Sequence, residues 1–361
     1  DTLFQITQSS GTSQIVDPGV KPNNIGATVN LNTIASTTNT YRYIAAFENI
    51  QANGYANIEF DGDVFIRNGD LSSNDDVTLN LTGGIGSTGG EVEYEGVTNM
   101  SFTGATMTLT NDFDVTGNLT FIDSNITVGK SDKTTPSITV GGKLDLTNSK
   151  IYSKATTATD EYYLYVKADE VELDATSEIN VDGTGYLSIT DNWTRSIGNI
   201  DWLSYVAGGH QGSGSYGGRG SSYHSTHQSN GVYGNYVWPN ELGSSPAESY
   251  GGAGGGSIRL EVENDFILNG SLSSIGTCNG SACGSGGSIL VETDTLSGTG
   301  NMIAEGGGGS KSHGAGGGGR IAIYSRTFAD NFAYPTTIIG NVSAAGGNNT
   351  YNATYTKGAA G

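Results

Sequence analysis

Closely spaced carboxylates are the residues of this chain that could most directly act on a substrate. A glycoside hydrolase needs two carboxyl groups about 5–9.5 Å apart, and a calcium ion needs several oxygen ligands. Aspartate is also the usual residue at turns, and no lysine or arginine clusters beside these pairs to serve as the base of a lyase. We therefore expect turn residues without catalysis or cofactor, with calcium binding as the alternative for the first two pairs. The pairs are Asp61 with Asp63, Asp75 with Asp76, and Asp112 with Asp114.

Two histidines, His224 and His227, have a spacing that could bind a metal ion. Their neighbours are serine, threonine and glutamine, with no helical pattern and no third ligand nearby, so we expect them to pack the loop. His210 and His313 lie in glycine-rich corners, where they can hydrogen-bond a neighbouring segment. The sequence contains no Ser-His-Asp arrangement, no Gly-x-Ser-x-Gly and no phosphate-binding loop with lysine. These residues together predict a protein that is not an enzyme.

A group of aromatic residues lies in one glycine-rich stretch and could contact sugar rings or another subunit. The alternative is that the same rings pack this stretch onto the body of the protein. The group comprises Tyr216, Tyr223, Tyr233, Tyr236, Trp238 and Tyr250.

Ten Asn-x-Ser/Thr sequons are present, a modest excess over chance in a chain so rich in asparagine, serine and threonine. Most lie at strand ends and turns, where a glycan can be accommodated, so we expect several to carry N-glycans in a eukaryotic source. None precedes Asn80, which fits a first segment that is buried in a contact. The acceptor residues are Asn80, Asn99, Asn118, Asn125, Asn192, Asn269, Asn279, Asn341, Asn348 and Asn352.

The two cysteines, Cys278 and Cys283, enclose a short loop of small residues. Two thiolates alone do not make a structural zinc site, and no further cysteine or histidine lies nearby. The spacing predicts a disulfide, which would stabilise the fold by about 2 kcal/mol and pin a corner. A disulfide in turn indicates an oxidising compartment.

Charge and composition narrow the class of protein. The formal net charge of −20 makes binding to nucleic acid or anionic lipid unfavourable, although it could attract divalent cations. No run of eighteen apolar residues exists, so we expect no membrane span. No basic, hydrophobic leader precedes Asp1, so we expect the processed form of a secreted protein.

The elements that must position these residues follow from a repeat. Residues 255–260 (Gly-Gly-Ser-Ile-Arg-Leu), 286–291 (Gly-Gly-Ser-Ile-Leu-Val) and 318–324 (Gly-Gly-Arg-Ile-Ala-Ile-Tyr) begin three copies of one unit. Each copy has a glycine-rich corner, a short alternating strand, a polar turn and a second strand. A unit this small cannot bury an apolar face alone, so the copies must stack. The pattern predicts an all-β chain, a right-handed parallel β-helix, also called a β-solenoid.

Three regions follow along the chain. Residues 1–75 contain strands without glycine corners and are expected to cap the solenoid or to dock another subunit. Residues 76–361 are expected to form the β-helix, with clean alternation of short strands over 76–206. Residues 207–257 break this rhythm as a long Gly/Tyr-rich insertion, which we expect to lie over one face of the solenoid.

The glycine-rich motifs carry a resemblance. Gly217-Gly218-Arg219-Gly220 is followed by Leu242-Gly243-Ser244 and then by the three repeat starts. This combination resembles the glycine-rich parallel β-helix regions of large secreted or cell-surface proteins in protists, algae and bacteria. The resemblance covers residues 207–347, extends loosely over 76–206, and does not include 1–75. It implies a β-helix fold and an extracellular location, and no particular activity.

The sequence therefore predicts a secreted structural glycoprotein, a subunit of a filament, sheath or surface fibre that assembles head-to-tail with copies of itself. Both ends of a solenoid expose strand edges, which favour end-to-end association. One alternative is a carbohydrate-binding adhesin that contacts extracellular polysaccharide through residues 207–257. A polysaccharide lyase or hydrolase on the same fold is the third, less favoured hypothesis.

Overall fold

The structure is a computed structural model of the chain, and it describes the backbone of ten strands before residue 99 and side chains in ten later segments. Every regular element in these described parts is a β-strand, which confirms the predicted all-β class. None of the described residues forms a helix that is long and apolar enough to cross a membrane. The ten segments are residues 99–109, 112–157, 159–187, 213–221, 231–246, 251–279, 282–308, 314–328, 342–348 and 357–361.

The strands in chain order are β1 (Phe4–Ile6), β2 (Gln14–Val16), β3 (Thr28–Asn30), β4 (Tyr43–Ala46), β5 (Asn49–Gln51), β6 (Ile58–Asp61), β7 (Val64–Asn68), β8 (Thr78–Thr82), β9 (Ile85–Thr88), β10 (Val92–Glu95), β11 (Asn99–Thr103), β12 (Thr106–Leu109), β13 (Phe113–Val115), β14 (Leu119–Ile122), β15 (Asn125–Val128), β16 (Ile138–Thr147), β17 (Lys150–Ser153), β18 (Leu164–Leu173), β19 (Glu178–Asn180), β20 (Ser257–Val262), β21 (Asp265–Leu268), β22 (Ser271–Ser273), β23 (Ser288–Ser297), β24 (Asn301–Ile303), β25 (Arg320–Phe328) and β26 (Val342–Ser343).

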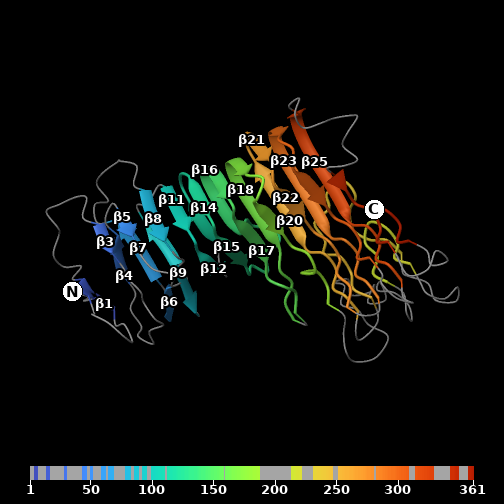
Figure 1. Cartoon of the computed structure of the whole chain (residues 1–361), viewed down its shortest axis with the longest axis horizontal. Helices are drawn as coiled ribbons and strands as arrows, with labels where there is room; N and C mark the ends of the chain where they lie inside the picture. Colours follow the sequence, from blue (N-terminus) through green and yellow to red (C-terminus); the bar gives the residue numbers. More distant parts are fainter. Residues whose placement is uncertain are drawn as a thin grey trace.

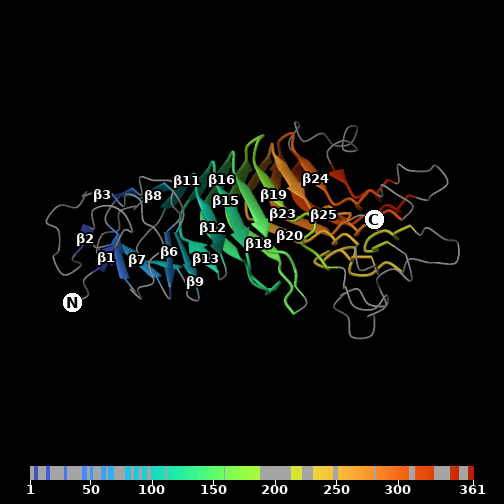
Figure 2. The ribbon, with the colours of Figure 1, turned by 60° about the horizontal axis from the view of Figure 1, so that its bottom comes forward.

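These strands form parallel stacks that run along the long axis of the molecule (Figures 1 and 2). One passage of the chain through the stacks is called a coil here. A seven-stranded sheet contains β12, β15, β17, β19, β22, β24 and β26, so each coil adds one strand to it. A ten-stranded sheet runs from β8 and β11 to β23 and β25 in the same way. Within the described strands, only β1 and β2 pair antiparallel.

Four long strands, β16, β18, β23 and β25, each span two stacks and so join them into one sheet. The first half of β16 pairs with β13 and its second half with β14, and the register shifts between Val140 and Lys143. The shift falls at Gly141 and Gly142, and a Cβ on Gly141 would lie 2.3 Å from the carbonyl oxygen of Thr116. The sequence predicts two short strands here, and the structure joins them. Because β20 and β21 lie end to end between β18 and β23, these four strands form a closed circuit of pairings.

The core lies inside the coils and is built from columns of apolar residues in register. Leu119, Leu144, Val171, Phe266 and Leu296 occupy the same position in successive coils, and each is at most 1% exposed. Each fully buried side chain of this kind stabilises the fold by about 1.5–3 kcal/mol. Threonine, asparagine and charged residues alternate with them and point outward, as the period of two requires.

Parallel pairing already begins at β3, which pairs with β5, and continues through β4, β7 and β10. The strands β6 and β7 on either side of Asp61-Gly62 do not pair with each other, because β6 pairs with β9 and β7 pairs with β4 and β10. They are consecutive strands of a coil rather than a hairpin.

The coils lengthen toward the C-terminus. Asn99 and its hydrogen-bonded partner Asn118 one coil later are 19 residues apart, whereas Ser257 and Ser288 are 31 apart. The additional residues leave the coils after β19, β22, β24 and β26 as extended segments without strand assignment. We call them the glycine wing; Figure 1 shows them as ribbons without arrows beside the C-terminal coils. The wing comprises residues 213–221, 242–246, 251–256, 274–279, 282–287, 304–308, 314–319, 344–348 and 357–361.

Backbone hydrogen bonds hold the wing together and point in three directions from each segment. The segment 282–287 donates to three neighbouring segments in turn and returns to the first after three residues. The bonds run from Gly284 N to Thr277 O (2.9 Å), Ser285 N to Ser244 O (2.9 Å), Gly286 N to Gly317 O (3.0 Å) and Gly287 N to Ser274 O (3.0 Å). A repeat of three residues is the geometry of a polyproline II helix, which lacks internal hydrogen bonds. Bundling of such segments supplies the missing partners.

Glycine is required where these segments touch. A Cβ on Gly286 would lie 2.2 Å from the carbonyl oxygen of Ala304, and one on Gly316 would lie 1.9 Å from that of Gly284. Both distances are far below a van der Waals contact with backbone. The chain is therefore glycine-rich because its wing segments pack backbone against backbone.

Sequence and structure differ at Tyr186, which the alternation assigns to a short strand with Leu187. In the structure Tyr186 is buried and bonds to two wing segments, through Gly243 O and Gly254 N. Over three or four residues, the period-two pattern of a strand cannot be distinguished from the sequence of an extended segment that bonds in three directions.

Candidate functional site

Residues 231–246 of the Gly/Tyr-rich insertion contact the outward side of the C-terminal strands, whereas its segments 213–221 and 251–256 belong to the glycine wing. The Arg320 guanidinium donates to the carbonyl oxygen of Tyr233 (2.9 Å), and Ser288 Oγ donates to that of Glu241 (2.8 Å). Leu290 of β23 occupies an outward position and is nevertheless 0% exposed. The insertion therefore covers this part of the sheet.

An arginine between two aromatic rings forms the centre of this contact. The Arg259 guanidinium lies 4.2 Å from the ring centroid of Tyr165 and 5.5 Å from that of Trp238. It also forms ion pairs with Glu261 (3.1 Å) and Glu292 (3.4 Å). We call these five residues the arginine cluster. Consecutive strands supply four of its members, and the insertion supplies Trp238.

Two pKa values in the arginine cluster are shifted. Burial raises the pKa of Tyr165 to about 12, and its hydrogen bond to Glu261 adds to the shift. Burial also disfavours the charged form of Glu261, but hydrogen bonds from Lys167 and Tyr165 outweigh it, so the pKa of Glu261 is lowered. A charged Glu261 and a neutral Tyr165 are the forms present at neutral pH. The matched charges of the strands therefore hold Arg259 in place, and Arg259 contacts the insertion through the ring of Trp238.

The predicted aromatic group separates into buried and exposed members. Tyr216 is 0% exposed, and its ring centroid lies 4.9 Å from that of Tyr233, whose hydroxyl donates to the carbonyl oxygen of Leu242. Burial raises the pKa of Tyr233 well above its ordinary value. These two tyrosines pack the insertion onto the body, which is one of the two alternatives that the sequence offers.

Trp238 and Tyr236 lie at the surface of the insertion. The Trp238 ring stacks on Tyr324 of β25, with centroids 5.5 Å apart and an angle of 30° between the planes. The Tyr324 hydroxyl donates to the carbonyl oxygen of Val237. Tyr236 is 78% exposed. Tyr223 and Tyr250 lie outside the described residues.

Of the carboxylate pairs, only Asp112 and Asp114 are described with side chains. They flank the buried Phe113, and Asp112 pairs with the buried ammonium group of Lys130, which also donates to Pro136 O (2.8 Å). Asp61 ends β6 without a described side chain, and Asp63, Asp75 and Asp76 lie outside the described residues.

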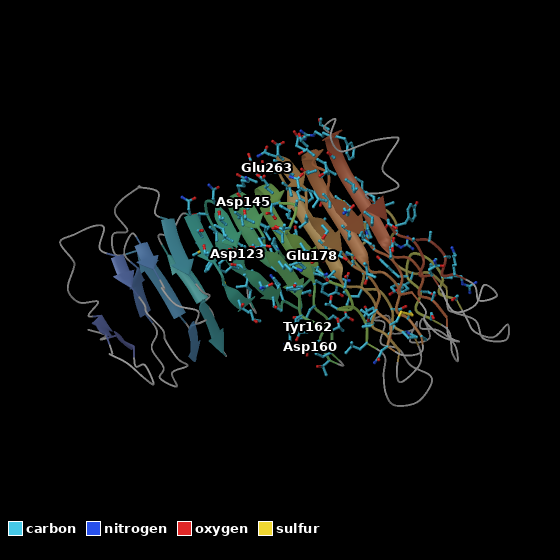
Figure 3. The ribbon with its side chains drawn as sticks, in the orientation of Figure 1. Asp123, Asp145, Asp160, Tyr162, Glu178 and Glu263 are labelled. Carbon is cyan, nitrogen blue, oxygen red and sulfur yellow. A yellow bond between two sulfur atoms is a disulfide. The ribbon has the colours of Figure 1, made fainter. Side chains whose placement is uncertain are left out.

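Other carboxylates of the described segments meet in pairs on a basic side chain, as Glu261 and Glu292 do on Arg259 and Asp145 and Glu172 do on Lys143. Figure 3 shows the labelled Asp123, Asp145, Glu178 and Glu263 distributed along different coils. No group of three or more histidine, cysteine, aspartate or glutamate side chains in the described segments could hold a metal ion. All four histidines, His210, His224, His227 and His313, fall outside these segments.

Six of the predicted glycosylation sites have described side chains. Asn118, Asn125, Asn279 and Asn348 are exposed, and Asn99 and Asn269 are half-buried. Asn99 Oδ1 accepts a hydrogen bond from Asn118 N (2.8 Å), and Asn118 Oδ1 accepts one from Lys143 N (2.9 Å). These bonds use the oxygen of each amide rather than the nitrogen that would carry a glycan. Asn80 is described as backbone within β8, and Asn192, Asn341 and Asn352 lie outside the described residues.

The predicted disulfide is present. Cys278 and Cys283 are bonded, with Cα atoms 4.3 Å apart, at the tip where wing segment 274–279 turns into 282–287 (Figure 3). Cys283 is buried, and a Cβ on Gly307 of the next coil would lie 2.9 Å from Cys278 Sγ. The disulfide therefore closes one excursion of the wing against its neighbour.

Sequence reasoning did not identify four members of the arginine cluster. Tyr165 and Arg259 are 94 residues apart, because the whole insertion separates β18 from β20. A signal for Arg259 was available, since it occupies the outward position that Leu290 and Ala322 hold in the other two repeat copies.

Comparisons of the chain with protein-family models, with curated proteins and with solved structures find no match.

Proposed function

We propose that this chain is a right-handed parallel β-helix and that it serves as a non-catalytic structural subunit of an extracellular filament, sheath or surface fibre. The handedness follows from the strong preference of parallel crossover connections for the right-handed form. The observation that supports the proposal best is the continuous parallel register from β8 to β25, which makes an elongated body with the same chain direction throughout.

Such a body favours head-to-tail association of copies. A copy translated along the long axis presents strands that run parallel to the last strand of its neighbour, so the contact is heterologous and can propagate. Residues 1–75 are the proposed docking segment. The formal charge of −20 supports partners other than nucleic acid.

The disulfide and the exposed sequons support secretion and N-glycosylation. Glycans on Asn118, Asn125, Asn279 and Asn348 would project from the outer surface without entering the core. We propose no cofactor, and calcium remains an alternative only for the acidic pairs before residue 77.

Electron microscopy of the full chain tests the filament proposal. Fibres of uniform width are expected. Deleting residues 1–75 should leave soluble monomers, with circular dichroism and a thermal melt as the control for folding. Fibres that persist after the deletion would contradict the role of this segment.

Carbohydrate binding is the second candidate, and the 78% exposed Tyr236 beside Trp238 favours it. A glycan array tests it with Trp238→Ala and Tyr236→Ala as comparisons. Binding that both substitutions leave unchanged would argue against the insertion as the site. A polysaccharide lyase or hydrolase is less favoured. New reducing ends or unsaturated products after incubation with acidic polysaccharides would show such an activity.

A further inference from the structure

The last strand of the ten-stranded sheet, β25, has a described partner on one side only. It pairs with β23 from Arg320 to Phe328, and no other described strand pairs with it. Arg320 N donates to the carbonyl oxygen of Gly287, which belongs to the preceding coil (2.9 Å). In a parallel sheet, each residue directs its N–H and its C=O to the same neighbouring strand, and the next residue directs both groups to the strand on the other side. Ile321, Ile323 and Ser325 therefore direct their N–H and C=O groups to the open side.

The apolar core is incompletely covered at the same end. Ile321 and Ile323 are only partly buried, whereas Ile289 and Val291, their register partners one coil earlier, are 0% exposed. Val342 of β26 is likewise partly buried, and its partner Met302 is fully buried. Each of these residues occupies the same position in its coil as its buried partner. The difference in exposure arises because no further coil covers the last one among the described residues. One more apolar layer would complete the core.

The distribution of charge along the chain indicates which segment of a second copy covers the last coil. Residues 306–361 contain four basic residues and one acidic residue, although the whole chain has a net charge of −20. Residues 1–98 contain three basic and twelve acidic residues. The termini lie at opposite ends of the long axis in Figure 1. When two copies align in the same direction, this basic C-terminal segment faces the acidic N-terminal segment of the next copy, whereas two acidic N-terminal segments would repel each other.

We propose that the open edge of β25 docks the N-terminal strands of a second copy of this chain, which continue the parallel sheet as the next coil. This inference rests on the proposed filament function and gives the filament a polarity. Backbone hydrogen bonds from Ile321, Ile323 and Ser325 supply the register, Ile321, Ile323 and Val342 supply the apolar contact, and opposite charges select the head-to-tail orientation.

The test compares Ser325→Pro with Ser325→Ala in the full chain. Both substitutions remove the Ser325 hydroxyl, which contacts the carbonyl oxygens of Asp294 and Thr327, but only proline removes the outward N–H. Ser325→Pro should raise the critical concentration for fibre formation about tenfold, and Ser325→Ala should behave as wild type. Sedimentation and electron microscopy measure the concentration, and thermal melts check folding.

A second variant keeps the proposal testable if proline disturbs the strand. Arg326 is 87% exposed and pairs with Asp294 at the surface (3.0 Å), a contact that contributes little to stability, so Arg326→Glu should leave the fold intact and raise the critical concentration several-fold. Equal assembly by Ser325→Pro, Arg326→Glu and wild type would overturn the docking site and leave the filament function standing. Wild-type protein that never assembles would overturn both.

Discussion

Individual glycines of the wing are fixed by backbone contacts rather than by unusual backbone angles. Gly286 illustrates this, because its Cα faces the Ala304 carbonyl and the Gly319 N–H at distances that leave no room for a methyl group. Gly231, by contrast, has no atom within 4 Å of a Cβ position. The two residues form a matched pair for testing the bundle.

Gly286→Ala should lower the free energy of unfolding by about 1–3 kcal/mol, since the neighbouring segments must move apart. Gly231→Ala should be neutral or stabilise by about 0.4–1 kcal/mol, because alanine restricts the unfolded chain. Denaturant midpoints of the two variants measure the difference. Equal midpoints would mean that the wing segments do not pack as closely as described.

The Glu261 carboxylate leads to a pH-dependent prediction. Its folded pKa lies below its ordinary value of 4.5, so the folded chain binds fewer protons there than the unfolded chain. The resulting stabilisation is present above about pH 4.5 and is lost as the pH falls through the folded pKa. Glu261→Gln should cost on the order of 1 kcal/mol at pH 7, and the cost should shrink below pH 4.5.

Urea unfolding of wild type and Glu261→Gln at pH 7 and at acidic pH measures this difference. Glu263→Gln is the control, because Glu263 is exposed and lies just after the same strand. A cost of Glu261→Gln that does not change with pH would show that packing, and not charge, fixes the contact.

At the scale of elements, the disulfide joins two antiparallel segments of the wing at their tip. The loop between Cys278 and Cys283 is short, so the chain-entropy model gives a stabilisation of only about 2 kcal/mol. The double substitution Cys278→Ser with Cys283→Ser should cost about this amount and leave the parallel sheets intact. Denaturation followed by circular dichroism measures the cost, and loss of the β-sheet signal in the native variant would contradict a local role.

The sequence predicted the elements that depend on residues close together in the chain. Alternation located most strands of 76–181 because one face of each is buried, as for Met107 with Leu109 and Ile126 with Val128. The spacing of Cys278 and Cys283 predicted their bond. The joined strands β16 and β18 were not predicted, since the bends at their centres interrupt the alternation without ending the strand.

The parts that sequence could not give depend on distant contacts. The wing needs partners from other coils, such as Gly218 N to Gly318 O, and no local pattern reports which segments meet. The arginine cluster depends on β18 pairing with β20 across the insertion. Of the aromatic group, composition alone could not separate the buried Tyr216 from the exposed Tyr236.

For the whole molecule, parallel pairing within the stacks is repeated from β3 to β26, and residues 1–98 and 306–361 carry net charges of opposite sign. A body of this kind translates onto itself along its axis. The repeat of the strands and the repeat of the subunits then share one direction, so the spacing between strands should continue across subunit boundaries.

Cryo-electron microscopy or fibre diffraction of assembled full-length chain tests this central claim most directly. The account predicts fibres with a spacing of about 4.7–4.9 Å along the fibre axis, since neighbouring strands are separated by that distance. It also predicts that all subunits point the same way. Single particles at every concentration, or fibres whose strands run along the axis, would contradict it.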